Sequence, residues 1–387
     1  MKKKARVIDA YSCGSYHEVV NQGYLMMISQ LYGEVTYIAE KKSINNLKSL
    51  LDACCVDYSN VTFVEKTFRF PKFKRAGLNY LLKLIIVSFF NYYYYIKSSK
   101  DEDVFYNNNL FFALALISNL SFWKKNCVYV MCHNEMEMID RKKRNTGVMK
   151  IWGYFLKRMF SNSVINKKIK LLLLSPKMVD YLKKFISTEN FEQIDWVDHC
   201  YIRPQNRIVA GEKNHKTSLK IGVPGAITET RGLHQLKKIL KIIDKSNVKL
   251  QATSFVAGIQ DSVNFECLNK KGGLLPFPEY NAFIQQMDVL VLFYEVGSYK
   301  LTASGAILEA IWNLKPVFAL KNDYFEYLFD RFGKIGRLFD CEDELADALM
   351  NLRRNELDDF RLALQHAKDS LHPNYVKLQL QNILRGN

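Results

Sequence analysis

The sequence has no continuous apolar run of the roughly 18 residues that a membrane-spanning helix needs. Residues 81–96 are interrupted by Lys83 and Asn91, and residues 110–123 are too short. We therefore expect both stretches to form buried helices of a large core. The first residues also lack the apolar segment of a secretory signal, so we expect the protein to stay in the cytoplasm.

The eight cysteines show no pattern of a metal or disulfide site. They are scattered, with no C-x-x-C pair and no grouping with histidine at zinc-finger spacing. Reduced thiols in a cytoplasmic protein are the simplest interpretation. The motif G-x-G-x-x-G does not occur, which argues against a dinucleotide cofactor. The motif G-x-x-x-x-G-K-[ST] of phosphate-binding P-loops does not occur either.

What the chain does have is length, apolar content and positive charge. Its 387 residues are 48% hydrophobic, which is too much for one ordinary domain and suits two packed cores. Lysine and arginine number 55 against 39 acidic residues, a formal charge of +16. This excess favours polyanionic neighbours such as phosphate ligands, nucleic acid or an anionic membrane surface.

Short apolar strands alternate with helical stretches in two successive series. A polar interval at residues 203–218 separates the series and is the best linker candidate. This alternation predicts two parallel sheets covered by helices. Ligands of such sheets bind at the carboxyl ends of strands, so the loops after Ala10, Met131, Val223 and Tyr294 are the places to examine. The strands are expected at residues 6–10, 35–39, 61–64, 104–106, 128–131, 171–174, 219–223, 249–256, 289–294 and 317–320.

One apolar helix carries a single carboxylate, Glu309. The helix begins near Ser304 and Gly305, where free backbone N–H groups and the helix dipole favour a diphosphate. Glu309 follows roughly 7.5 Å along the axis, where its carboxylate could accept hydrogen bonds from both hydroxyls of a ribose. Alternatively, Thr302, Gly305, Glu309 and Asn313 form a solvated stripe of the helix.

Four segments carry a resemblance to glycosyltransferases of the GT-B fold. Residues 304–320, "SGAILEAIWNLKPVFAL", resemble the donor-site signature of that family. Residues 224–240 resemble the loop and helix that open its second domain, residues 272–294 the segment in between, and "CHNE" at 132–135 a loop of its first domain. The resemblance implies an α/β protein of two Rossmann-like, parallel-sheet domains that face each other across a cleft.

The same resemblance implies a division of the chain. Residues 1–203 would form the acceptor-binding domain and residues 204–370 the nucleotide-sugar-binding domain. Residues 371–387 would be a helix that packs back toward the first domain.

The resemblance also assigns residues to the donor. Glu309 would bind the ribose, and Arg231 of the Arg-Gly pair that follows Gly225 would bind phosphate, although a solvated side chain is the ordinary role of an arginine at a helix start. Lys300 could supply a second cation, and Thr302, Ser304 and Gly305 would offer backbone amides to the leaving diphosphate. The donor would be of the UDP or GDP type and serve as substrate, with no cofactor.

Two departures from the family pattern affect the chemistry. Leu301 stands where many retaining members have a first glutamate, and Ala226 stands where they have an arginine. Glu295 could take over the contact with the sugar. No Asp-x-Asp motif follows a strand, since Asp101–Asp103 precede one, so we expect no metal and a metal-independent reaction.

The acceptor side rests on the first domain. His133, His17 or Glu18 could act as a general base in an inverting reaction, whereas a retaining reaction, which we favour, could use the leaving phosphate. His133 could equally be a hydrogen-bonded core residue. Gly14, Ser15, Tyr16 and Glu135 are the further acceptor-side candidates, although a turn alone would explain the glycine.

Residues 141–170 contain ten lysines and arginines and no acidic residue, interleaved with Ile151, Trp152 and Phe155. Such a basic, aromatic amphipathic helix suits an anionic membrane surface, although a solvated helix with its apolar side in the core has the same pattern. We expect a peripheral enzyme at the inner face of the membrane, a hexosyltransferase with a glycan or lipid-linked acceptor in cell-surface polysaccharide or glycoconjugate synthesis.

Three other functions stay open. A GT-B-like protein could bind its ligand without catalysis, which the departures at Leu301 and Ala226 allow. A nucleotide-sugar epimerase would share the fold. Nucleic-acid binding agrees with the charge but has no recognisable module, and we do not expect nucleic acid as a partner.

Overall fold

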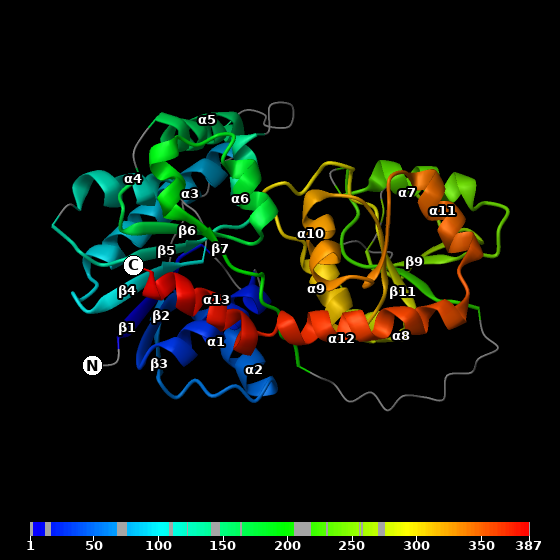
Figure 1. Ribbon diagram of the computed structural model, residues 1–387, viewed down its shortest axis with the longest axis horizontal. Coiled ribbons are helices and arrows are strands. Elements are labelled where there is room, and N and C mark those ends of the chain that lie inside the picture. The colour runs from blue at the N-terminus through cyan, green and yellow to red at the C-terminus, as the bar shows by residue number, and fades with distance from the viewer. Residues whose placement is uncertain are drawn as a thin grey trace. The chain divides into compact units, whose positions relative to one another are not determined.

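The chain divides into two compact units in a computed structural model (Figure 1). The first unit comprises Met1–Gln205, Leu301–Ala303 and Leu371–Asn387, and the second comprises Asn206–Lys300 and Ser304–Ser370. The structure describes residues 3–11, 17–67, 76–107, 111–121, 123–140, 148–162, 165–204, 218–229, 231–254, 256, 258–269 and 275–386. Most of the expected linker lies outside these ranges.

The first unit is built on a seven-stranded sheet whose order is β3-β2-β1-β4-β5-β6-β7. All its neighbouring strands are parallel. The central strands β4 and β5 are buried along their whole length, as expected of a sheet covered on both faces. The strands are β1 Lys4–Asp9, β2 Glu34–Glu40, β3 Val61–Lys66, β4 Glu102–Tyr106, β5 Val128–Met131, β6 Ile169–Leu173 and β7 Ile194–Trp196.

Two groups of helices pack around this sheet. One group is α1 Glu18–Leu31, α2 Lys41–Ala53 and α13 Pro373–Arg385. The other is α3 Ala76–Ile96, α4 Phe111–Leu120 and α5 Val148–Asn162 (Figure 1). The unit is completed by α6 Pro176–Leu182 and the 3-10 helices η1 Asn134–Ile139 and η2 Thr188–Gln193.

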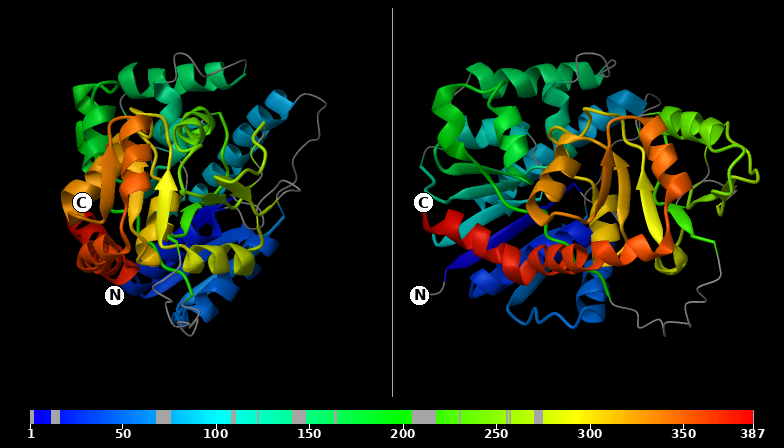
Figure 2. Two further views of the ribbon diagram at one scale, coloured as in Figure 1. Left: turned by 90° about the vertical axis from the view of Figure 1, so that its right-hand side faces the viewer. Right: turned by 45° about the vertical axis from the view of Figure 1, so that its right-hand side comes forward.

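The second unit has a six-stranded parallel sheet in the order β10-β9-β8-β11-β12-β13 (Figure 2). Its strands are β8 Ile221–Val223, β9 Leu250–Ala252, β10 Phe265–Cys267, β11 Val289–Leu292, β12 Val317–Leu320 and β13 Gly336–Phe339. Its helices are α7 Leu233–Ile242, α8 Phe277–Gln286, α9 Gly305–Trp312, α10 Asp323–Phe332, η3 Arg354–Phe360, α11 Glu342–Asn351 and α12 Arg361–Ser370.

Both sheets share one topological feature that positions a ligand site. The first strand of each sheet, β1 or β8, lies beside the fourth, β4 or β11. The strand order reverses between these two strands, and ligands of open parallel sheets bind at the carboxyl ends of such a pair. The predicted fold class of two Rossmann-like parallel-sheet domains is therefore confirmed. All ten predicted strands are present, whereas β7, β10 and β13 were missed.

The two most apolar stretches form helices, α3 and α4, but the expectation that these helices are buried is wrong in part. Phe89 and Tyr93 of α3 are 58% and 51% exposed, and Leu120 at the end of α4 is 51% exposed. The helices are apolar on more sides than their contacts with the core require. Within the described ranges no helix combines the length and the apolar character needed to cross a membrane.

Candidate functional site

Glu309 is a buried carboxylate inside α9. Only 4% of the residue is exposed, so the solvated-stripe interpretation is wrong for this residue. Asn313 lies one turn further and donates its Nδ2 to Oε1 of Glu309 at 3.2 Å and to its backbone oxygen at 2.9 Å. Because burying a carboxylate is costly unless it is hydrogen-bonded, its retention in an apolar helix indicates a role beyond packing.

The start of α9 has no side-chain cap. Ser304 occupies the N-cap position, but its hydroxyl makes no cap hydrogen bond and instead lies 3.4 Å from the hydroxyl of Tyr294. The first amides of a helix have no partner within the helix, and here no side chain replaces one. Together with the helix dipole, they form a seat for an anion.

An aromatic stack supports this helix start. Tyr294 is the second residue after β11, and the ring of Tyr299 stacks on it with centroids 4.5 Å apart and planes 12° apart. Tyr299 has a φ of 58°, an uncommon backbone conformation for a side chain of this size. Sequence reasoning missed both tyrosines, because a turn that folds one ring onto the other has no periodic signature.

Gly232 explains why an Arg-Gly pair opens α7. It is the N-cap with a φ of 85°, and a Cβ there would lie 2.4 Å from the backbone oxygen of Phe293. Only glycine lets the start of α7 approach the end of β11 this closely. Arg231, directly before Gly232, is exposed and lies near the carboxyl end of β11, the end at which ligands of open parallel sheets bind.

The remaining donor-side candidates lie around the same loops. Gly225 follows β8 with a φ of 82°, and its N–H donates to Oγ1 of Thr253 at 2.9 Å. Glu295 and Gly305 are exposed, and Lys300 is half-buried.

Thr302 differs from these candidates because it is grouped with the first unit. Its hydroxyl is buried without a hydrogen-bond partner. Arg231, Glu295, Lys300, Ser304, Gly305 and Glu309 all belong to the second unit.

In the first unit, His133 lies at the centre of a histidine cluster, which we define as His17, His133 and His199. The ring centroids of His17 and His199 are 5.2 and 6.2 Å from that of His133. His133 is 6% exposed, and its Nε2 is buried without a hydrogen-bond partner. A neutral ring can therefore use this nitrogen to accept a proton.

The pKa values of all three histidines are lowered. Burial, and to a smaller extent the nearby His199, lower the pKa of His17 to about 4. Burial and then the two neighbouring histidines hold the pKa of His133 well below its ordinary value. Burial also lowers the pKa of His199. All three rings are therefore neutral at pH 7, the form in which an imidazole nitrogen can accept a proton.

A polar network at the ends of β1 and β4 was missed by sequence reasoning. The buried carboxylate of Asp9 accepts hydrogen bonds from Nδ2 of Asn21 at 2.6 Å and from the hydroxyl of Tyr37 at 3.1 Å. Asn107 donates its Nδ2 to Oδ1 of Asn21 at 2.9 Å. These residues connect the carboxyl ends of the two strands at the topological reversal. A polar residue at each strand end was the available signal.

The other first-unit candidates have different outcomes. Gly14, Ser15 and Tyr16 lie outside the described residues, as does the side chain of Glu135. His17 is the N-cap of α1 with a φ of 59°, and Glu18 is the first residue of that helix.

The acidic run at 101–103 serves the fold. Glu102 lies 2.9 Å from a guanidinium nitrogen of Arg6, and Asp103 accepts a hydrogen bond from Tyr32 at 2.7 Å. Among the residues that the structure describes, no group of three or more His, Cys, Asp or Glu is placed to hold a metal ion.

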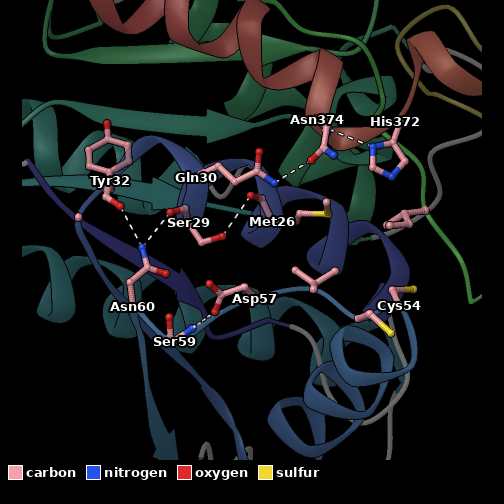
Figure 3. Close-up of a pocket in the computed structure, with 14 residues that line it drawn as sticks. Met26, Ser29, Gln30, Tyr32, Cys54, Asp57, Ser59, Asn60, His372 and Asn374 are labelled. Atoms are coloured by element: carbon pink, nitrogen blue, oxygen red, sulfur yellow. Dashed lines mark hydrogen bonds between the residues drawn. The ribbon is translucent and has the colours of Figure 1, made fainter.

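A cavity of about 660 Å³ opens elsewhere on the first unit (Figure 3). It lies between the carboxyl end of α1 and the start of α13, near the amino-terminal end of β2. Its polar side chains bond to one another and to nearby backbone: Gln30 donates to Asn374 at 2.8 Å, and Asn60 donates to the backbone oxygens of Ser29 and Tyr32. This cavity is distant from the carboxyl edge of the sheet, so it is not the candidate site.

Solved structures match the whole chain at low sequence identity. Sucrose-phosphate synthase from Thermosynechococcus elongatus is 13% identical, with a TM-score of 0.62, and the match covers 100% of this chain and 99% of that one. HepE from Anabaena, solved with UDP and glucose, is 12% identical, with a TM-score of 0.61 and full coverage of both chains. WaaG, described as a glycosyltransferase of lipopolysaccharide biosynthesis, is 13% identical, with a TM-score of 0.57, covering 99% and 100%.

No protein-family model and no curated protein matches the sequence. The likeness to solved structures therefore concerns the fold, and it confirms the predicted GT-B architecture.

Proposed function

We propose that the protein is a glycosyltransferase that moves a sugar from a nucleoside diphosphate to an acceptor hydroxyl. The observation that carries this proposal is the buried carboxylate of Glu309 inside α9, a helix that begins with uncapped amides beyond β11. A diphosphate at the helix start and a ribose at Glu309 fit the spacing of about 1.4 helical turns between Ser304 and Glu309. HepE, a solved protein of the same fold, binds UDP and UDP-glucose, which supports a donor of this class.

The chemistry depends on charge that develops on the leaving diphosphate. As the glycosidic bond breaks, negative charge grows on the phosphate oxygen, and preorganised donors lower the barrier. The second unit offers two kinds of such groups: the positive charges of Arg231 and Lys300, and the backbone N–H donors of Ser304 and Gly305. Thr302 is a further candidate donor. We propose that these groups act without a metal and without a cofactor, with Gly225 shaping the loop beside them. Glu295 is the candidate contact to the sugar.

The acceptor hydroxyl must lose a proton during transfer. His133 presents a neutral imidazole with Nε2 unpartnered, so it is our first candidate for a group that accepts or orients that proton, and His17 is the second. We favour retention of the anomeric configuration, with the leaving phosphate as the base. We further propose a hexose donor and a glycan or lipid-linked acceptor in surface polysaccharide synthesis at the cytoplasmic face of the membrane.

The test is a thermal-shift panel of UDP, GDP, ADP, CMP and their sugar conjugates. A ligand at 100 times its dissociation constant stabilises the protein by about 2.7 kcal/mol. We expect one nucleoside diphosphate to stabilise the wild type and to lose most of that effect in Glu309→Gln. The matched control is Glu279→Gln, which changes an exposed carboxylate on α8 of the same unit.

Each result of the panel has a defined meaning. A shift that survives Glu309→Gln unchanged would contradict the ribose assignment. Binding of a nucleotide without sugar transfer to any acceptor would favour a binding protein. Conversion of the donor sugar without an acceptor would indicate an epimerase. If no nucleotide shifts a folded wild type, the glycosyltransferase proposal is wrong.

A further inference from the structure

Exposed apolar side chains are concentrated on one group of helices. Helices α3, α4 and α5, with Trp123 after α4, hold nine of the 17 large apolar side chains that are exposed among the described residues. Scattered exposed apolar residues are normal, but a concentration marks an interaction site. We name these exposed side chains on the three helices and Trp123 the three-helix surface.

Helix α5 is apolar on two sides. Trp152 and Leu156 face the core and are at most 2% exposed. Ile151, Tyr154 and Phe155, at spacings of three and four, form a second side and are 52%, 59% and 47% exposed. Only the first side is explained by folding, so the interpretation of a solvated helix with its apolar side in the core does not account for the second side.

The exposed side chains of α3 and α4 extend this surface. Phe89 and Tyr93 lie one turn apart on α3, and the hydroxyl of Tyr92 donates to the backbone oxygen of Leu120 at 3.4 Å. The ring of Phe112 at the start of α4 contacts Trp152 of α5, with centroids 5.6 Å apart. The three helices pack against one another in one layer (Figure 1), so their exposed residues belong to one part of the unit.

The charge of the chain is concentrated in the same part of the sequence. Residues 66–170 contain 20 lysines and arginines and 6 acidic residues, a formal charge of +14 out of the chain's +16. Two of the acidic residues, Glu102 and Asp103, are buried and hydrogen-bonded to other side chains. On α5 the cations Lys150, Lys157 and Arg158 are exposed beside the apolar side.

We propose that the three-helix surface docks on a lipid bilayer with anionic headgroups. Aromatic and aliphatic side chains bury into the boundary between headgroups and acyl chains, and the flanking lysines and arginines are attracted to anionic lipids. A second copy of this chain is a poor occupant, because the two surfaces would carry the same strong charge. Nucleic acid would pair with the cations but would leave Ile151 and Leu120 without a partner.

This surface is larger than the segment 141–170 that the sequence indicated, because α3 and α4 contribute five of its nine exposed apolar side chains. The proposal does not depend on sugar transfer, since docking needs neither donor nor acceptor. Its failure and that of the proposed function are therefore distinguishable.

The experiment is co-sedimentation of the full chain with vesicles of phosphatidylcholine alone or mixed with phosphatidylglycerol. One variant combines Tyr93→Ser with Trp123→Ser, and a second combines Tyr154→Ser with Phe155→Ser. The control combines Val263→Ser with Leu362→Ser, which are 85% and 86% exposed on the second unit. Unchanged thermal midpoints establish that each variant is folded.

We expect the wild type to bind the anionic vesicles, to bind neutral ones weakly, and to lose affinity in salt. Each surface variant should bind at least about tenfold more weakly, and the control should bind like the wild type. No sedimentation with anionic vesicles overturns the proposal. The proposal is also overturned if both aromatic variants bind the vesicles like the wild type and salt removes this binding, because charge alone then explains the attraction.

Two other occupants have their own readouts. A doubled mass in light scattering that the aromatic variants abolish would mean that a second copy covers the surface. Equal binding to a random oligonucleotide, sensitive to the same substitutions, would assign the surface to nucleic acid. Either result overturns the lipid proposal.

Discussion

The histidine cluster makes the stability of the first unit depend on pH. The pKa of His17 falls from 6.5 to about 4 on folding, chiefly through burial. Between these values the unfolded chain binds a proton that the folded chain does not, so the free energy of unfolding falls as the pH drops. For His17 alone the loss is at most about 3 kcal/mol, and His133 and His199 shift in the same direction.

We expect the variant His17→Asn to lose less thermal stability than the wild type between about pH 7 and about pH 4.5. Asparagine tolerates the left-handed backbone of this position better than most residues do. The measurement is the thermal midpoint at each pH, and the control is His234→Asn, which changes an exposed histidine on α7. If both variants follow the wild type, His17 does not contribute to the acid sensitivity.

At the scale of the element, the contact between α7 and β11 depends on one missing Cβ. Gly232→Ala would place a carbon 2.4 Å from the oxygen of Phe293 at a φ of 85°, and we expect it to cost roughly 3 kcal/mol from the backbone conformation and the clash together. Gly297→Ala is the matched control, because Gly297 has a φ of 73° with nothing within 4 Å. It should cost about 1 kcal/mol.

The difference between the two variants isolates the clash, and chemical unfolding measures it. Gly232→Ala should also weaken nucleotide binding, because the clash moves Arg231 away from the end of β11. Equal costs for both glycines would mean that α7 has room to shift. In that case the Arg-Gly pair is not needed to set this contact.

The strands that sequence reasoning found and missed differ in their place in the sheet. The interior strands β5, β11 and β12 are continuous apolar runs, because both of their faces are covered. The missed strands β7, β10 and β13 are all edge strands. They contain Asp195, Glu266 and Arg337, since an edge strand can be short and carry charge. Apolar periodicity has too few residues to act on there.

The residues of the candidate site also differ in how well the sequence predicts them. The neighbours of Glu309 come from one contiguous motif, so a resemblance could identify them. Asp9, Asn21 and Asn107 meet only after folding, from positions up to 98 residues apart. His133 and His199, which are 66 residues apart, also come together only in the folded unit. For Glu309, helical spacing alone fitted a solvated stripe as well as a ribose ligand. Only the burial of the carboxylate in the folded unit excludes the solvated stripe.

On the scale of the whole molecule, the first unit is completed by the last helix of the chain. Helix α13 packs on α1 (Figure 1), and Gln30 hydrogen-bonds to Asn374 across 344 residues of sequence. Leu380 is fully buried on this helix, whereas Leu378 is 51% exposed. The stability of the first unit therefore depends on residues that follow the entire second unit.

We expect Leu380→Ala to destabilise the first unit by about 2–5 kcal/mol, because it removes buried apolar volume and leaves a cavity. Leu378→Ala on the same helix should change stability by no more than about 0.5 kcal/mol. Tryptophan fluorescence during urea unfolding reports chiefly on this unit, since Trp123, Trp152 and Trp196 lie in it and only Trp312 lies in the second. Hydrogen exchange then locates the loss: faster exchange confined to α1 and α13 agrees with the expectation, whereas uniform acceleration across both units would mean that α13 stabilises the chain as a whole.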